Sequence, residues 1–367
     1  MASIYKQLTS NDVASTKTLL HEAIPLTGTI VSGTYGDNNI KNYAHGMFQS
    51  VYDYPYLSSS ANHIFDITVG YSNNSTLSSS AATHTQNTKK INMYNEMAQV
   101  LVGYNVTGGV RQFDKDGDFY GTTADKMKEV IVLPFARLLC KDEIKKGSFE
   151  LELGVTANWD NANEFVDRVK ISDVSGSTSY FVNSPAGEYG VLYATGSTYA
   201  ASQVVLSANK YFAVGLIYYQ AGIAVLSSSI FKSATDGGIL NNSIGSTEMN
   251  IGQDEIEAIL TGSQISSSAD DLRHRIYNLQ FNNTVELNST IYFCRANHNE
   301  FNYSANPTYL SGSTIRIKTN ATDTPISYIT TIGLYSTDNQ LLAVGKLSEP
   351  LRKDPANEIT VRARLDY

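Results

Sequence analysis

The sixteen residues from Tyr211 to Leu226, YFAVGLIYYQAGIAVL, decide the fold of this chain. The stretch is almost wholly apolar, yet a membrane-spanning helix needs about 20 such residues. This one is shorter, contains Gln220, and is rich in tyrosine and β-branched side chains. Gln220-Ala221-Gly222 interrupts it in the way a turn does. We therefore predict two buried strands here, and no association with a membrane.

Strand patterns extend outward from this stretch on both sides. Residues 148–153, SFELEL, alternate polar and apolar with a period of two, which indicates a half-buried strand. Further strands, separated by Gly, Ser and Asn turns, follow to about Phe231, and residues 130–133, VIVL, also read as a strand. Several short strands bounded by turns are typical of sandwiches and barrels. The predicted fold class is mainly β, with sandwich or barrel-like sheets and a few short helices.

Three segments have helical patterns. Ser10-Asn11-Asp12 can cap a helix over residues 11–24 that ends at Pro25, and apolar residues share one face over 90–102 and over parts of 253–278. These patterns suggest three regions. They are an N-terminal mixed α/β region (1–147), a central β domain (148–250), and a helical linker with a C-terminal hairpin-rich region (251–367).

Composition narrows the classes of function. The chain of 367 residues has a net charge of −8, which argues against sequence-independent binding of nucleic acid. Cys140 and Cys294 are the only cysteines, too few for a disulfide framework, so we expect two free thiols. The first residues contain no apolar signal segment, so we expect synthesis in a cytoplasm.

Motifs of catalysis are missing from the sequence. It contains no nucleophile elbow, no phosphate-binding loop and no His-Glu-x-x-His. Cys294 and His298 are four residues apart, but they lie where a strand pattern runs into a turn. We interpret them as a buried thiol and a loop histidine rather than as zinc ligands, of which a site needs four. We expect no enzyme activity, no cofactor and no obligatory metal.

Residues 114–118, Asp-Lys-Asp-Gly-Asp, resemble the start of a calcium-binding loop. An EF-hand has Gly at its sixth position and Glu at its twelfth, where this chain has Phe119 and Asp125. We favour an acidic surface turn. Because the carboxylates of Asp114, Asp116 and Asp118 can converge, a looser calcium site stays open as the alternative.

A carbohydrate site is a second alternative. Trp159 could act as an aromatic platform for a sugar, with Asp160 and Glu164 as paired acids. A lone tryptophan in a region of strands and loops is more often part of the core, so we do not assign catalytic residues.

The C-terminal region carries a resemblance. Residues 326–347, ISYITTIGLYSTDNQLLAVGKL, resemble a phrase of tailed-phage structural proteins, in which a strand ending IGLY turns into LLAVGKL. Residues 348–351, 135–149, 215–219 with Gly222, and the terminal strand pattern Ile359–Tyr367 are also similar to virion proteins of contractile-tailed phages. The resemblance is to tail-collar, tail-fibre and baseplate proteins, and it implies a β-hairpin over 326–347.

The apolar pattern of this hairpin predicts strands that are covered on both faces. Ile329 lies on one face, and Ile332 and Leu334 lie on the other. Packing between subunits and packing inside a sandwich explain such a pattern equally well.

These observations lead to one expected function and two alternatives. We expect a structural protein of a phage virion, in the tail or baseplate, that contacts other virion proteins and copies of itself. The alternatives are a carbohydrate-binding or glycan-degrading tail-fibre protein and a neck or capsid-associated protein. Tyr, which occurs 24 times, gives large contact areas at a small entropic cost.

Overall fold

A computed structural model describes most of the chain. The described residues are 5–27, 37–79, 84–119, 125–154, 168–195, 211–232, 238–239, 256–304, 310–311, 314–315, 320 and 322–367. Strands make up 47% of the structure and helices 17%, so the prediction of a mainly β protein with few short helices is confirmed. None of the helices in the described ranges is long and apolar enough to cross a membrane.

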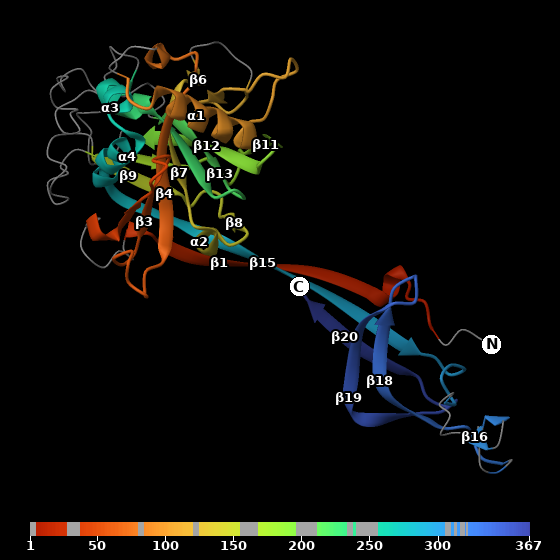
Figure 1. The fold of residues 1–367 in the computed structure, drawn as a ribbon. Helices are drawn as coiled ribbons and strands as arrows, with labels where there is room; N and C mark the ends of the chain where they lie inside the picture. Colours follow the sequence, from red (N-terminus) through yellow and green to blue (C-terminus); the bar gives the residue numbers. More distant parts are fainter. Residues whose placement is uncertain are drawn as a thin grey trace. The chain divides into compact units, whose positions relative to one another are not determined.

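The chain divides into two units, shown as ribbons in Figure 1. Unit 2 comprises residues 20–285, and unit 1 comprises residues 1–19 together with 286–367. Two strands, β1 (Val13–Pro25) and β15 (Ile276–Ala296), contain residues of both units.

Unit 2 contains thirteen further described strands and four described α-helices. The strands are β2 (Ile40–Asn42), β3 (Gln49–Tyr52), β4 (His63–Tyr71), β5 (Phe113–Asp114), β6 (Lys126–Met127), β7 (Glu129–Pro134), β8 (Glu143–Ile144), β9 (Glu150–Gly154), β10 (Arg168–Ser172), β11 (Phe181–Ser184), β12 (Gly187–Thr195), β13 (Tyr211–Tyr218) and β14 (Ile223–Ser227). The helices are α1 (Asn87–Leu101), α2 (Arg137–Cys140), α3 (Ile256–Gly262) and α4 (Ile265–His274).

One large antiparallel sheet organises unit 2. Its strand order is β15-β9-β10-β12-β13-β14-β7-β4-β3-β2. The stretch 211–226 forms the paired strands β13 and β14, so the prediction of two buried strands with a break near Gln220 is confirmed. The sheet takes strands from all three regions that the sequence patterns distinguish.

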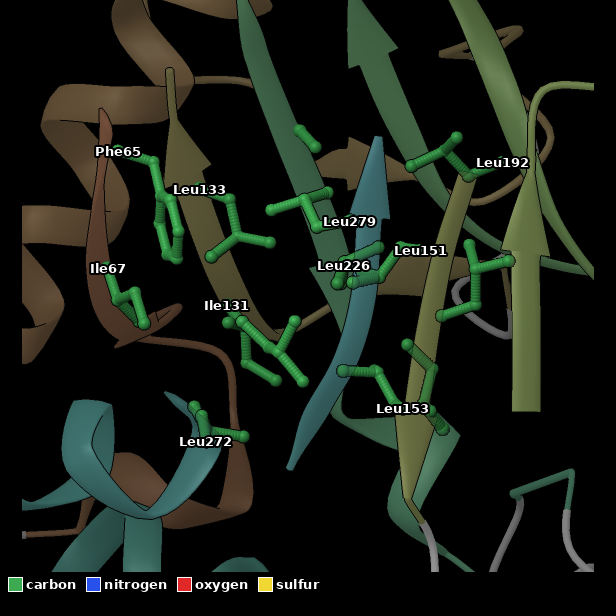
Figure 2. Packing of buried hydrophobic residues seen from close by; sticks show 14 of the residues in the cluster. Phe65, Ile67, Ile131, Leu133, Leu151, Leu153, Leu192, Leu226, Leu272 and Leu279 are labelled. Carbon is green, nitrogen blue, oxygen red and sulfur yellow. The ribbon is translucent and has the colours of Figure 1, made fainter. Parts of the chain in front are cut away.

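Both faces of this sheet are buried, which explains the continuous apolar runs in its strands. On one face, Ile131 of β7 lies opposite Leu226 of β14, and both belong to the larger core cluster. Figure 2 shows this core, which contains side chains of β4, β7, β9, β12, β14 and β15 together with Leu272 of α4. On the other face, Val132 lies opposite Val225 in a second cluster.

Helix α1 covers this second face. Its residues Tyr94, Ala98 and Leu101 are buried in the second cluster. The helix approaches β4 closely at Gly70, where a Cβ atom would lie 2.7 Å from the carbonyl oxygen of Lys90. A glycine is required at this contact, because any side chain would push the helix away from the sheet.

The predicted helices have mixed outcomes. The helix over 90–102 is confirmed as α1, and the helical segment over 253–278 is confirmed as α3 and α4, although β15 already begins at Ile276. The helix over 11–24 is wrong, because Val13–Pro25 is strand β1. Thr9 and Asp12 do form a capping box, but it closes only the short 3₁₀ turn Ser10–Asp12.

Unit 1 is built from short antiparallel pairs. Strand β18 (Ser327–Tyr335) pairs with β19 (Leu341–Lys353) in the predicted hairpin, and residues 336–340 form its turn. Strand β20 (Ile359–Asp366) pairs with β15, with Val361 opposite Cys294. A third pair is the small hairpin of β16 (Leu310–Ser311) and β17 (Thr314–Ile315). The strand predicted at Ile359–Tyr367 is confirmed as β20.

The predicted burial of this hairpin on both faces is wrong within a single chain. Ile329, Ile332 and Leu334 are half-buried, and most of the other residues of β18 and β19 are exposed. The two strands were predicted from the alternation of apolar and polar residues and from turn residues, and both are local features of the sequence. Burial depends on what packs against the strands, and the described residues of the chain leave most of this hairpin uncovered.

Candidate functional site

The acidic loop of residues 114–118 does bring its carboxylates together. Oxygen atoms of Asp114, Asp116 and Asp118 all lie within 4.8 Å of one another. The loop follows β5, whose Asp114 pairs in register with Lys126 of β6. Asp114 is buried, whereas Asp116 and Asp118 are exposed. Spacing in the sequence correctly predicted that the three groups can converge.

A lysine already compensates the buried charge of this loop. Lys126 forms a short ion pair with Oδ2 of Asp114. Burial raises the pKa of Asp114, while the lysine acts in the opposite direction. Carboxylate oxygens are the ligands that Ca²⁺ prefers. Here the ammonium group of Lys126 already neutralises the buried carboxylate of Asp114. We therefore assign no ion to the loop.

Cys294 and His298 lie in different environments. Cys294 is half-buried in β15, where burial raises the pKa of its thiol. His298 is exposed and lies 3.1 Å from Glu358, measured from Nε2 to Oε1. Within the described ranges, the carboxylates of residues 114–118 are the only cluster of metal-ligating side chains. Trp159, Asp160 and Glu164 lie outside the described residues.

A buried polar cluster that sequence patterns did not predict surrounds Asp173. Its carboxylate accepts hydrogen bonds from the backbone N–H of Gly147 at 2.7 Å and of Phe149 at 2.9 Å. The hydroxyl of Tyr219 donates to it at 3.1 Å. Burial raises the pKa of Asp173 to about 6, and it also raises the pKa of Tyr219.

This cluster has a structural arrangement rather than a catalytic one. All of its donors point at one carboxylate that is 1% exposed, so no substrate atom reaches it. Gly190 leaves room for the phenol, since a Cβ there would lie 2.2 Å from its hydroxyl. The cluster joins the loop before β9 to the ends of β10 and β13. Asp173 and Tyr219 are 46 residues apart in sequence, so no local motif marks them.

A serine, an aspartate and a histidine meet on β3 and β4 without forming a catalytic triad. Ser50 donates to Oδ1 of Asp66 at 2.5 Å, and His63 bonds to the same oxygen at 2.8 Å. A nucleophilic serine needs the histidine as its own hydrogen-bond partner. Here the carboxylate takes that place, so the serine is not activated.

The unusual property of this chain is the exposure of apolar residues in unit 1. Fifteen of the large hydrophobic side chains in its described part are exposed, from Tyr5 to Tyr367. By contrast, Ala296 is its only described hydrophobic residue that is buried, and neither core cluster contains a residue of unit 1. The apolar face of β20 is also only half-buried at Ile359, Val361 and Ala363.

Four of these exposed residues form what we call the hairpin patch: Tyr335, Leu341, Leu342 and Val344. Their exposed fractions are 43%, 54%, 69% and 61%. Val344 lies opposite Gly333 in the register of the hairpin, and the ring of Tyr335 lies beside the same glycine. The ring of Tyr5 lies 4.7 Å from that of Tyr335 and extends the apolar surface.

Polar contacts hold unit 1 together in place of a core. Lys353 is buried and donates to Asn302 and to two backbone carbonyls. Ser289 bonds to Asp366, and Asp12 forms an ion pair with Arg295. These hydrogen bonds and ion pairs fix how the strands of unit 1 lie against one another.

No family model, no curated protein and no solved structure proved similar to this chain.

Proposed function

We propose that this protein is a structural component of a phage virion, in the tail or baseplate, that acts through protein–protein contacts. One observation carries the proposal: unit 1 presents paired strands with exposed apolar side chains and almost no buried ones. Monomeric soluble proteins rarely expose large apolar patches, and such patches mark interaction sites. The resemblance of residues 326–347 to tailed-phage proteins is the reason for proposing that these contacts occur in a virion.

The polar clusters of unit 2 agree with this function. Asp173 is saturated by donors from the protein itself, and Asp114 is paired with Lys126. Both carboxyl groups are buried and have their partners within the fold. Unit 2, with two core clusters, then provides a rigid body from which unit 1 makes contacts.

The test is to locate the protein in particles. An antibody raised against the purified chain is applied to gradient-purified virions of the source phage, in an immunoblot and in immunogold microscopy. We expect the protein to sediment with intact particles and the label to appear on the tail. Protein that is confined to the infected-cell lysate and missing from purified particles would refute the virion function.

A further inference from the structure

Among the described residues of unit 1, the strands lack the hydrophobic core that a folded unit of this size requires. Apart from Ala296, at 6% exposure, every described hydrophobic residue of unit 1 is at least partly accessible. Burial of apolar surface is the dominant favourable term in folding. A two-stranded hairpin is marginally stable in water on its own. The described strands of unit 1 therefore need apolar surface beyond what they supply to one another.

We propose that a second copy of this chain supplies that surface, and that the hairpin patch is the centre of the contact. The inference rests on the proposed function as an assembly protein and names its partner. Leu342 and Val344 are the most exposed members of the patch, and the ring of Tyr335 fills the space beside Gly333, the residue opposite Val344. A surface of this kind can be self-complementary, as contacts between identical copies across a two-fold axis require.

The exposed area is sufficient for a stable contact. Large hydrophobic side chains present on the order of 150–250 Å² when fully exposed. Fifteen of them, each exposed by about a third to three quarters, together present on the order of 1,000 Å². A standard interface removes about 800 Å² from each partner. The exposed apolar surface of unit 1 as a whole is therefore comparable to what one copy contributes to a standard interface, and the hairpin patch supplies part of it.

Charge favours a contact between two copies of unit 1 over one between two copies of unit 2. The sequence of unit 1 contains ten Lys and Arg residues and nine Asp and Glu residues, a net charge of +1. The remaining seventeen basic and twenty-six acidic residues give unit 2 a net charge of −9. Two copies of unit 2 would repel each other, whereas two copies of unit 1 would not.

Open backbone edges provide a second means of contact. In the described part of the chain, β18 pairs only with β19, and β20 pairs only with β15. The free edge of a strand can pair with a strand of another chain.

The experiment measures the mass of the full-length chain by size-exclusion chromatography with light scattering. The test variant carries Leu342→Asp and Val344→Asp. The control carries Leu57→Asp and Val106→Asp, two residues of unit 2 that are at least as exposed. We expect the parent and the control to have at least twice the mass of one chain, and the test variant to have the monomer mass. A parent that is monomeric at 100 µM, or a test variant with the parental mass, would overturn the proposal.

Cross-linking keeps the proposal testable if the aspartate variant does not fold. Leu342→Cys should form a chain-to-chain disulfide under mild oxidation, and Leu57→Cys should not. The natural thiols interfere little, because burial raises the pKa of Cys140 to about 12 and that of Cys294 above its ordinary value. Absence of cross-linked dimer at residue 342 would also overturn the proposal. A dimer that is missing from virions would instead refute the virion function alone.

Discussion

Asp173 shows how one buried carboxyl group can link the stability of this protein to pH. Three donors surround it, yet burial outweighs them and raises its pKa from 3.8 to about 6. The folded protein therefore binds a proton more tightly than the unfolded chain does. Stability from this group is complete below about pH 4 and is lost as the pH rises through 6.

Replacing Asp173 by asparagine should remove this pH dependence. One pKa unit corresponds to about 1.4 kcal/mol, so Asp173 should lower the free energy of unfolding by roughly 3 kcal/mol between pH 4 and pH 7. Urea denaturation of the parent and Asp173→Asn at both pH values measures the difference. Asp338→Asn, at an exposed turn residue, is the control and should keep the parental slope. Parallel pH profiles for the parent and Asp173→Asn would contradict the assignment.

Contacts between residues that are distant in the sequence limit how much of the candidate site can be predicted from the sequence. The convergence of Asp114, Asp116 and Asp118 could be predicted, because spacing of two residues in a tight turn determines it. The pairing of Asp173 with Tyr219 could not, because the order of strands in the sheet brings them together. Lys126 was missed for the same reason: it neutralises Asp114 across the β5–β6 pair.

At the scale of elements, the buried side chain of Lys90 caps the C-terminal end of helix α3. Nζ of Lys90 donates to the carbonyl oxygens of Leu260 at 2.6 Å and of Ser263 at 2.7 Å. These groups lie at the C-terminal end of the helix, where carbonyls have no partner within the helix. Burial lowers the pKa of Lys90 to about 8. The side chain thus ties α1 to α3.

Lys90→Met should loosen this connection. The substitution keeps most of the apolar stem but leaves buried carbonyls unpaired, which costs about 1–3 kcal/mol. We expect a lower melting temperature and faster hydrogen exchange in residues 256–263. Lys89→Met, at the exposed neighbour that bonds to His45, should change stability by less than about 0.5 kcal/mol. Equal effects of the two substitutions would show that the lysine does not cap α3.

Strand β20 is the second element whose removal has a clear expected result. Its eight residues pair with Ser289–Ala296 of β15, so truncation after Pro355 leaves that edge unpaired and exposes Cys294. We expect the shortened chain to be insoluble or to lose its oligomeric mass, as light scattering and the soluble fraction would show. Arg362→Lys, on the exposed face, is a control that should behave like the parent. A truncated chain with parental solubility, melting temperature and mass would refute this function of the strand.

Elements with strong local patterns were predicted best. β13, β14, α1 and the hairpin of β18 and β19 followed from periodicity and turn residues. β1 was predicted as a helix because Ser10-Asn11-Asp12 resembles a cap, but pairing with β15 in the sheet outweighed that signal. The β-branched residues Val13, Thr16 and Thr18 agree with the strand.

At the scale of the whole molecule, the two units differ in what stabilises them. Unit 2 contains both core clusters, whereas unit 1 relies on polar contacts and on the proposed second copy. Their stabilities should therefore respond differently to protein concentration. An interface between copies gains stability with concentration by mass action, and a core within one chain does not.

Differential scanning calorimetry at 5 µM and at 200 µM should show two transitions. We expect the lower one, from unit 1, to move to higher temperature at the higher concentration, and the upper one, from unit 2, to stay in place. The variant with Leu342→Asp and Val344→Asp should lose the concentration dependence of the lower transition. One transition that is independent of concentration would contradict a unit 1 stabilised by association.

The division of the chain also sets an order of events during synthesis. Residues 20–285 lie between the two segments of unit 1. At about 5–20 residues per second, the ribosome takes on the order of ten seconds to a minute to make them. Residues Val13–Leu19 are therefore synthesised on the order of ten seconds to a minute before residues 286–296 of β15. The hairpin patch lies within residues 335–344, so chains that terminate before it lack the surface that we propose for the contact between copies.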